Sequence, residues 1–374
     1  MFTTMTEQLD DILDLTCGEL QLPPSWHDAA EEHYHAICAW LEALGSELRL
    51  FRPIMYPQGS FRIGTTVRPI GRDEYDLDLV CELALDYRQN EPRVILELVE
   101  RRLRENGTYR PMVKRLKRCI RLTYAEQFHL DVLPACPEIP PAGTRLRVPD
   151  RELRLWMPSN PKGYALWFET RSGLYLAALK RMAEPVPEQQ TAMEKTPLQR
   201  AVQLLKRWRD ITYRNDADRA PRSIVLTTLA GQVYAGELST SAALTAMIEG
   251  ILRLTASRIE PLDVRNPTNG EELLSEKWRE DPADYRLFVQ NLRVFKQQWD
   301  EALTTSGPAL AAILEELFGD ETRRAFKRQA ERVNAARSSG TLRTAIGSGL
   351  LTTGASRSIQ VRPNTFYGDV SADS

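Results

Sequence analysis

The sequence predicts an α+β fold, in which β-strands precede a part of the chain that is built from helices. Apolar and polar residues alternate over 75–82, and again in two stretches that begin at Cys119 and Phe128, as they do in half-buried strands. From Ser172 onward the apolar residues instead recur every three or four positions, which is typical of amphipathic helices. The strand-forming part of the chain therefore comes before a helical part.

The composition predicts a soluble globular protein. Its 374 residues can bury a substantial core, and 42% of them are hydrophobic and 27% charged. No apolar run approaches the roughly 18 residues that span a bilayer, and the N-terminus lacks the basic and apolar regions of a signal peptide. Five scattered cysteines without a Cys-x-x-Cys pair indicate reduced thiols and argue against a structural zinc site. We expect a cytoplasmic protein without a membrane segment.

We expect the chain to be organised in four segments. They are N-terminal helices that brace both lobes (1–50), a catalytic core (51–145), a helical lobe (146–337) and a flexible C-terminal tail (338–374). Two further boundaries are predicted inside these segments. The strand that begins at Phe128 should end at Pro134, and one helical pattern covers 308–337.

The chemistry is concentrated in two acids of the strand predicted over 75–82. Asp76 and Asp78 are two residues apart, and residues i and i+2 of a strand point to the same face. Leu77 and Leu79 would then face the core on the other side. Two carboxylates side by side favour a divalent cation, and magnesium commonly combines one or two protein carboxylates with substrate phosphates.

A Gly-Ser turn lies upstream of these acids. The backbone at Gly59 can approach a phosphate closely, and the hydroxyl of Ser60 can hydrogen-bond to it. A Gly-Ser turn followed by an Asp-x-Asp strand is the signature of the polymerase-beta-like nucleotidyltransferases, in which turn and strand hold a nucleoside triphosphate and its metals. The alternative is a polar turn and an edge strand with outward-facing acids.

A third acid, Asp131, lies on a polar face of the later strand that begins at Phe128. A two-metal phosphoryl-transfer site needs such a third carboxylate, because one metal activates the attacking hydroxyl while the other holds the triphosphate. The alternative for Asp131 is an acid at the end of a strand that makes a turn contact.

Four motifs in order carry a family resemblance over about 40–335. They are Gln58-Gly-Ser, Tyr75-Asp-Leu-Asp-Leu, His129-Leu-Asp-Val and Leu204-Leu-Lys-Arg-Trp. The chain resembles the CD-NTases, the bacterial relatives of cyclic GMP-AMP synthase. This resemblance implies a polymerase-beta-like nucleotidyltransferase core with a mixed sheet, packed against a C-terminal helical lobe, with the active site in the cleft between them. It also implies an enzyme of bacterial anti-phage defence that joins ATP and other ribonucleoside triphosphates into a cyclic di- or trinucleotide and releases pyrophosphate.

The resemblance also implies roles for individual residues. Two Mg²⁺ ions, for which Mn²⁺ is a possible substitute, would be held by Asp76, Asp78 and Asp131. The nucleotide would be bound by Gly59, Ser60, Lys206 and Ser223. The sequence adds that Lys206 follows a predicted helix start at Thr196 and lies at a basic edge of that helix, and that Ser223 lies in the first turn of the next helix, where the dipole favours anions.

Partners are predicted from the same resemblance and from charge. Animal relatives carry a zinc element and a basic DNA-binding surface, whereas this chain has a formal charge of −2 and shows neither, so direct activation by nucleic acid is not expected. We expect a HORMA-type regulatory protein to bind the C-terminal tail around Phe366-Tyr367. This is favoured over covalent conjugation, because the terminus Ser-Ala-Asp-Ser does not resemble the small-residue terminus that conjugation uses.

Two other functions remain open from the residues. The three acids also suit a nucleotidyltransferase that modifies an RNA, a protein or a small molecule, and an inactive relative would still bind nucleotides. Product analysis separates the first alternative from the cyclase, and magnesium-dependent turnover separates the second.

Overall fold

The computed structural model describes residues 5–71, 75–124, 128–173, 189–256, 260–345, 351–352 and 358–361. The chain divides into two compact units. One is Leu20–Lys296, and the other combines Met1–Glu19 with Gln297–Ser374. The four segments predicted from the sequence stay a prediction. No helix in the described ranges has the length and apolar character needed to cross a membrane.

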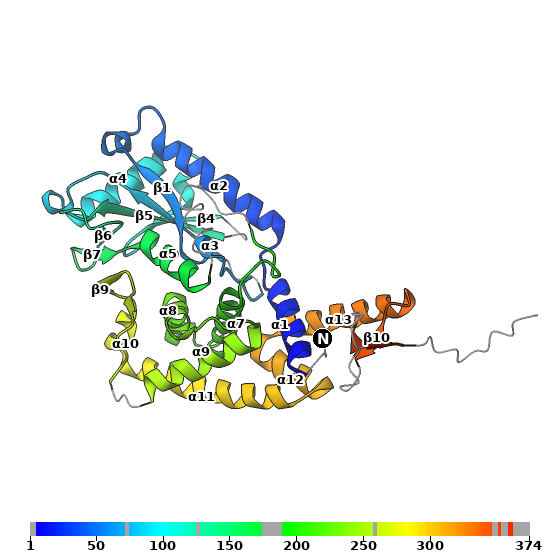
Figure 1. The fold of residues 1–374 in the computed structure, drawn as a ribbon. Helices are drawn as coiled ribbons and strands as arrows, with labels where there is room; N and C mark the ends of the chain where they lie inside the picture. Colours follow the sequence, from blue (N-terminus) through cyan, green and yellow to red (C-terminus); the bar gives the residue numbers. More distant parts are fainter. Residues whose placement is uncertain are drawn as a thin grey trace, which may run out of the picture. The chain divides into compact units, whose positions relative to one another are not determined.

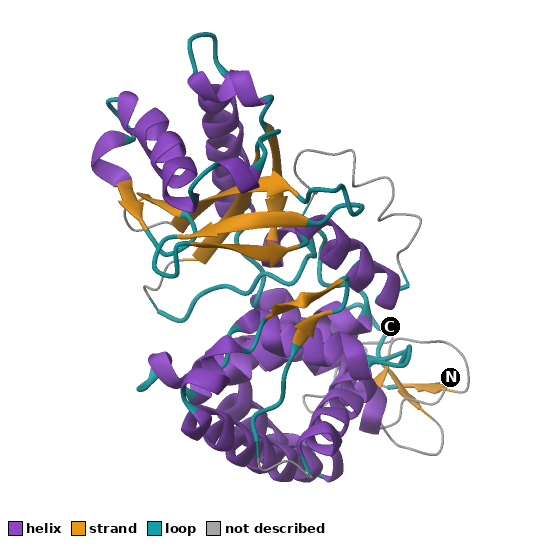
Figure 2. Ribbon diagram, turned by 90° about the vertical axis from the view of Figure 1, so that its left-hand side faces the viewer, coloured by secondary structure: helices purple, strands orange, loops and turns teal. Residues whose placement is uncertain are grey.

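The larger unit is built on a seven-stranded sheet (Figure 1, Figure 2). Its strands are β1 (Ile54–Gln58), β2 (Tyr75–Glu82), β3 (Val113–Arg115), β4 (Ile120–Tyr124), β5 (Phe128–Pro137), β6 (Leu146–Asp150) and β7 (Leu155–Ser159). The order is β1-β2-β5-β4-β3, with β6 beside β5 and β7 beside β6. Strands β2 and β5 are parallel and the other pairs are antiparallel. The mixed sheet that the family resemblance implies is confirmed.

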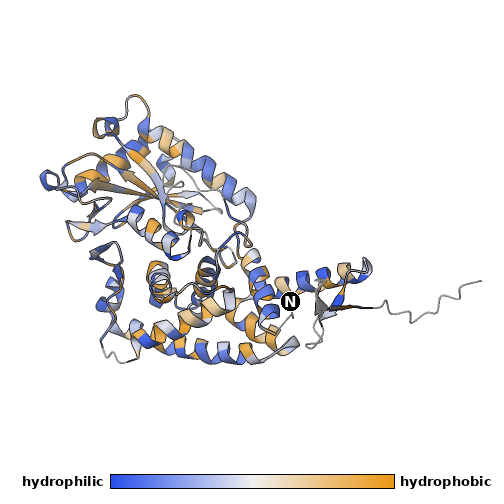
Figure 3. Cartoon of the chain, viewed as in Figure 1, coloured by the Kyte–Doolittle hydropathy of each residue, from blue (hydrophilic) through white to orange (hydrophobic). Residues whose placement is uncertain are grey.

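One face of the sheet packs against helices α2 (Pro24–Glu42) and α4 (Pro92–Glu105). Leu77 and Leu79 of β2 share this core with Leu130 of β5. Apolar residues recur along the strands and along the helices that cover them, as the hydropathy colouring shows (Figure 3). Because neighbouring side chains of a strand alternate between faces, this packing turns the acids of β2 and β5 to the opposite face.

Strand β5 runs to Pro137, so the predicted end at Pro134 is wrong. The pairing of β5 with β4 stops at Val132, which lies opposite Ile120. Beyond that point β5 lacks a β4 neighbour, and proline is tolerated where one side of a strand is not paired. The sheet also continues past residue 145 through β6 and β7, where we expected the helical lobe to begin.

Further helices of the larger unit complete it. They are α3 (Gly59–Arg62), α5 (Pro161–Arg171), α7 (Pro197–Thr212), α8 (Ser223–Val233), α9 (Thr240–Thr255), α10 (Glu276–Glu280) and the first part of α11 (Pro282–Thr304), with a hairpin of β8 (Arg265–Asn266) and β9 (Asn269–Leu273) and 3₁₀ turns at Glu47–Phe51, Tyr87–Gln89, Arg110–Met112 and Ala217–Arg219. Helix α7 opens with the expected capping box, in which the side chains of Thr196 and Gln199 each accept the other's backbone N–H.

The smaller unit contains α1 (Met5–Glu19), packed against α13 (Asp320–Ser338), and α12 (Gly307–Phe318). The single helical stretch predicted over 308–337 is two helices, because Gly319 adopts a φ of 80° between them. In the tail, β10 (Arg343–Ala345) pairs with β11 (Leu351–Thr352) and β12 (Ser358–Gln360). The proposed regulator-binding segment at Phe366-Tyr367 lies outside the described residues.

Candidate active site

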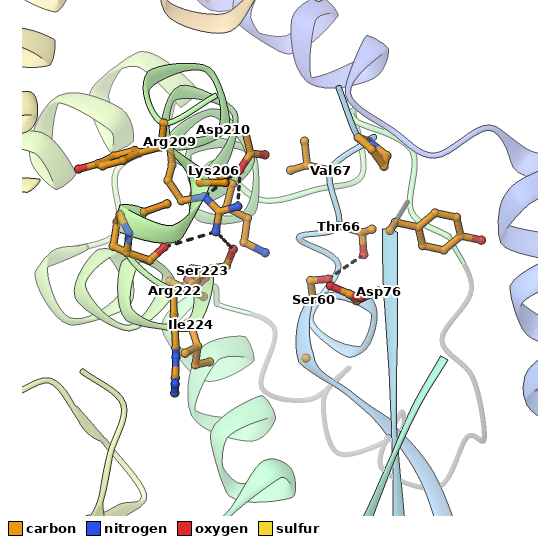
Figure 4. Close-up of a pocket in the computed structure, with 18 of the residues that line it drawn as sticks. Ser60, Thr66, Val67, Asp76, Lys206, Arg209, Asp210, Arg222, Ser223 and Ile224 are labelled. Carbon is orange, nitrogen blue, oxygen red and sulfur yellow. Dashed lines mark hydrogen bonds and ion pairs between the residues drawn. The ribbon is translucent and has the colours of Figure 1, made fainter. Parts of the chain in front are cut away.

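A cleft of about 1010 Å³ lies within the larger unit, between the sheet and helices α7 and α8 (Figure 4). Its sheet side includes Gly59, Ser60, Thr66, Asp76 and Asp78, and its helical side includes Lys206, Arg209, Asp210, Ser223 and Lys277. Six of the seven site residues predicted from the sequence therefore line one cleft. The seventh, Asp131, lies beside them on the sheet.

The three predicted acids occupy adjacent strands. In the parallel register of β2 and β5, Asp78 lies directly opposite Asp131, and Asp76 is on the same face two residues earlier. The side chain of Asp76 is 54% exposed and that of Asp131 only 12%. The structure thus brings together three carboxylates that are up to 55 positions apart in the sequence. Their catalytic role stays a prediction.

Sequence reasoning missed Arg121, which contacts two of these acids. Its Nε and Nη2 donate to the two oxygens of Asp131 at 2.7 and 2.8 Å, and Nη2 also donates to Asp76 Oδ1 at 3.0 Å. Arg121 lies opposite Asp131 in the antiparallel pair of β4 and β5. The signal was in the sequence, because a three-residue connection between Tyr124 and Phe128 fixes this pairing.

The turn before β2 approaches the acids so closely that it requires glycine. Gly59 has a φ of 65°, and a Cβ there would lie 2.4 Å from Oδ2 of Asp78. The pKa of Asp78 is raised to about 7, mainly by burial and then by the negative charges of Asp131 and Asp76, while the positive charge of Arg121 opposes the shift. The site concentrates negative charge that a cation would stabilise.

Helix α7 holds the loop that follows Ser60. Lys206 Nζ donates to the carbonyl oxygen and to the hydroxyl of Thr65 at 3.0 and 3.1 Å, and the Thr65 N–H donates to the carbonyl of Ser60 at 2.9 Å. One turn earlier in the helix, Gln203 donates to the carbonyl of residue 66, and two turns earlier Gln199 donates to the carbonyl of residue 63. One face of α7 therefore fixes the position of the Gly-Ser turn relative to the helix.

A second cation of the helical wall, Arg209, contacts Ser223. Arg209 Nη1 donates to Ser223 Oγ at 2.6 Å, and its guanidinium also pairs with Asp210, as Figure 4 shows. The pKa of Lys206 is lowered to about 7, mainly by burial and then by the positive charge of Arg209. The helical wall thus presents donors and positive charge opposite the acids of the sheet, which is the arrangement that a triphosphate and its cations need.

The donor set fits a divalent metal. Aspartate oxygens are hard ligands of the kind that magnesium prefers, and the glycine at position 59 leaves room beside Asp78. In the part of the chain that the structure describes, no three Asp, Glu, His or Cys side chains converge as a finished ligand group. Asp76 and Asp131 point instead to Arg121. Metal binding by Asp76 and Asp131 would therefore require both side chains to release Arg121.

Comparisons with known proteins identify the family. Residues 13–171 match the model of the Second Messenger Oligonucleotide or Dinucleotide Synthetase domain. The chain is 35% identical over 382 residues to the c-di-GMP synthase of Roseivirga ehrenbergii, which covers 97% of this chain and 98% of that protein. It is 30% identical over 328 residues to the cyclic dinucleotide synthase CdnG of Bradyrhizobium diazoefficiens, covering 80% of this chain and 77% of the relative.

The fold agrees with this relationship. The structure of the Bradyrhizobium diazoefficiens CD-NTase CdnG in complex with GTP matches with a TM-score of 0.71 at 28% identity, over 86% of this chain and 99% of that one. The similarity extends across both the sheet and the helices, so it is not limited to the motifs around the acids. The chain belongs to the CD-NTase family of nucleotidyltransferases, the enzymes that synthesise cyclic oligonucleotides.

Proposed function

We propose that this chain joins two molecules of GTP into a cyclic dinucleotide, with release of pyrophosphate, in a magnesium-dependent reaction of anti-phage defence. The observation that carries the proposal is the cleft itself, in which Asp76 and Asp78 face Lys206 and Ser223 across a shared space. The choice of guanine rests on the c-di-GMP synthase that is 35% identical over 97% of this chain.

The size of the cleft supports a reaction between two nucleotides. Ligand pockets are typically about 300–1,000 Å³, and this cleft, at about 1010 Å³, is at the upper end of that range. A transferase that acts on a protein or RNA acceptor needs room for one nucleotide and an open approach for the acceptor. A cyclase needs to hold a donor and an acceptor together, and later to let the linear intermediate reverse its orientation in the same cleft.

The chain's own residues have separate roles in this proposal. The Gly59 backbone and the Ser60 hydroxyl bind the donor phosphates, and Lys206 contributes its remaining N–H and its positive charge from the other wall. Magnesium ions held by Asp76, Asp78 and Asp131 would activate the attacking ribose hydroxyl and neutralise the leaving pyrophosphate. The rigid pairing of β2 with β5 holds those acids at a constant separation, so that acceptor and donor meet in line.

The test is a product assay with matched variants. Purified protein is incubated with four labelled ribonucleoside triphosphates and Mg²⁺ or Mn²⁺, treated with phosphatase, and the products are resolved by chromatography and mass spectrometry. We expect a phosphatase-resistant cyclic dinucleotide of guanine that Asp76→Ala abolishes. The control Asp86→Asn removes an acid just beyond β2 and outside the cleft, and it should retain the product.

Other outcomes decide between the alternatives. A resistant product with adenine would replace the guanine assignment while keeping the cyclase. Pyrophosphate release without a cyclic product, only in the presence of an added RNA or protein, would instead support the acceptor-modifying alternative. Binding of GTP without any turnover under these conditions, and with candidate HORMA-type regulators added, would support the inactive relative. The regulator itself stays a prediction, because its proposed segment lies outside the described residues.

A further inference from the structure

Arg121 forms a row with the acids across three strands of the sheet. Asp78 on β2 lies opposite Asp131 on β5, and Asp131 lies opposite Arg121 on β4. Cross-strand partners share a face, so all three side chains emerge on the side of the cleft. The Arg121 side chain is 25% exposed, so it is held by the acids while part of it remains accessible to solvent.

One nitrogen of this guanidinium lies between two acids. Nη2 of Arg121 is 2.8 Å from Asp131 Oδ2 and 3.0 Å from Asp76 Oδ1. A magnesium ion that joined these carboxylates would lie at about 2.0–2.1 Å from an oxygen of each. A guanidinium nitrogen and a divalent cation cannot both lie between the same pair of oxygens. Arg121 and a metal ion therefore compete for Asp76 and Asp131.

The strength of that competition follows from the type of contact. Arg121 binds Asp131 through two parallel hydrogen bonds, the geometry in which arginine holds a carboxylate most firmly. Its positive charge also repels any divalent cation that approaches the acids. Lys206 on the opposite wall gives two of its hydrogen bonds to Thr65 and contacts none of the three acids in the bonds described. Arg121 is thus a cation in direct contact with this cluster.

We propose that Arg121 makes metal loading depend on the nucleotide. A metal ion alone must displace the guanidinium from Asp76 and Asp131, whereas a metal that arrives with a triphosphate brings phosphate ligands and negative charge that offset the lost contacts. Binding of the metal and binding of the nucleotide are then positively coupled, and the coupling is reciprocal. This inference rests on the proposed metal role of Asp76, Asp78 and Asp131.

The experiment measures metal affinity directly and does not depend on turnover. Free Mn²⁺ is followed by electron paramagnetic resonance during titration of the full chain, with and without a non-hydrolysable GTP analogue. For the unaltered protein we expect weak binding alone and markedly tighter binding with the analogue. Arg121→Gln should tighten Mn²⁺ binding in the absence of nucleotide by about tenfold, the factor that one lost charge-assisted contact is worth, and should shrink the coupling accordingly.

Two further variants keep the result interpretable. Lys114→Gln removes a positive charge from the exposed position opposite Arg121 on β3, and it should leave Mn²⁺ affinity unchanged. Arg121→Lys keeps the charge but cannot bridge both acids with a planar fork, so its affinity should fall between those of Arg121→Gln and the unaltered protein. Far-ultraviolet circular dichroism and the melting temperature establish that each variant is folded.

The possible failures are distinct. If the unaltered protein binds no Mn²⁺ even with the analogue, the proposed metal site is wrong. If it binds Mn²⁺ with the analogue but Arg121→Gln leaves the affinity without nucleotide unchanged or weaker, the metal site stands and the inference about Arg121 is overturned. Equal tightening in Lys114→Gln would also overturn it, because the effect would then reflect net charge and not the contact with Asp76 and Asp131.

Discussion

The two walls of the cleft hold their charged groups in different ways. On the sheet wall, Asp76, Asp78 and Asp131 are fixed by strand alternation and by the register of β2 with β5. On the helical wall, Lys206 and Arg209 are fixed by contacts with other parts of the chain, namely Thr65 and Ser223. The positions of the acids on the sheet wall consequently depend on the local strand pattern and on one strand pairing. The positions of the cations on the helical wall depend on how the helices pack. We expect substitutions on the first wall to abolish chemistry and those on the second to weaken binding.

The largest effect is expected at the centre of the acid row. Asp78→Asn should reduce cyclic product formation by about a thousandfold or more. A neutral amide is a poor ligand for a divalent cation, so the cation that would activate the attacking hydroxyl is lost. The same change should not unfold the protein, since it removes a charge from a crowded site. Initial rates of product formation and circular dichroism would check this, and a variant that keeps more than a tenth of the activity would contradict it.

The same substitution has a stability effect with a defined pH dependence. The pKa of Asp78 is raised to about 7 in the folded protein, against an ordinary value of about 3.9 when unfolded. Between these values the folded state binds more protons, so the unaltered protein loses stability as the pH rises through this window. Asp78→Asn lacks that loss. Measured with a metal chelator present, its melting temperature should exceed that of the unaltered protein by more at pH 8 than at pH 5.

The next effect tests how close the Gly-Ser turn lies to the acids. Gly59→Ala should reduce activity by about a hundredfold or more, because its methyl group would occupy the space 2.4 Å from Oδ2 of Asp78. Gly45→Ala is a matched control. That residue also has a positive φ, of 89°, but nothing lies within 4 Å of its Cβ position. The control should share a stability loss of about 1 kcal/mol without losing activity; comparable activity losses in both would mean that backbone strain, not the acid, is responsible.

On the helical wall the effect should be on binding. Lys206→Met keeps a similar length while removing the charge and the bonds to Thr65, and it should raise KM for GTP by about tenfold to a hundredfold with a smaller change in kcat. Because burial lowers the pKa of Lys206, stability at pH 7 should not fall much. Lys195→Met changes another buried lysine outside this cleft and should alter the melting temperature without raising KM. Steady-state kinetics on both variants separate the two effects.

The smallest effect is expected where one wall residue only supports another. Ser223→Ala removes the oxygen that accepts from Arg209 at 2.6 Å. Arg209 keeps its pairing with Asp210, so a loss of about 1 kcal/mol, or roughly fivefold in kcat/KM, is expected. A loss as large as that of Lys206→Met would show that Ser223 binds a substrate phosphate directly, and it would contradict the supporting role that we assign to Ser223.

The sequence by itself determined the parts of this protein that depend on short-range pattern. Alternation located β2 and β5 and put Asp76 and Asp78 on one face, and the capping residues located the start of α7. It also located Asp131 as a candidate, because a metal site of two adjacent acids lacks a third ligand. These features follow from spacing within a few residues, which the backbone geometry of strands and helices fixes before any long-range contact forms.

Only the tertiary structure decided the rest. The pairing of β2 with β5 places Asp78 beside Asp131 across more than 50 residues of chain, and no local rule fixes a register between distant strands. Lys206 lies in the Leu204-Leu-Lys-Arg-Trp motif, and Arg121 lies on a strand that three residues join to β5, but only the folded chain shows that Lys206 contacts Thr65 and that Arg121 contacts Asp131. Local pattern therefore identified the acids, whereas packing decided which groups the cations contact, because a contact between residues distant in the sequence exists only after the chain has folded.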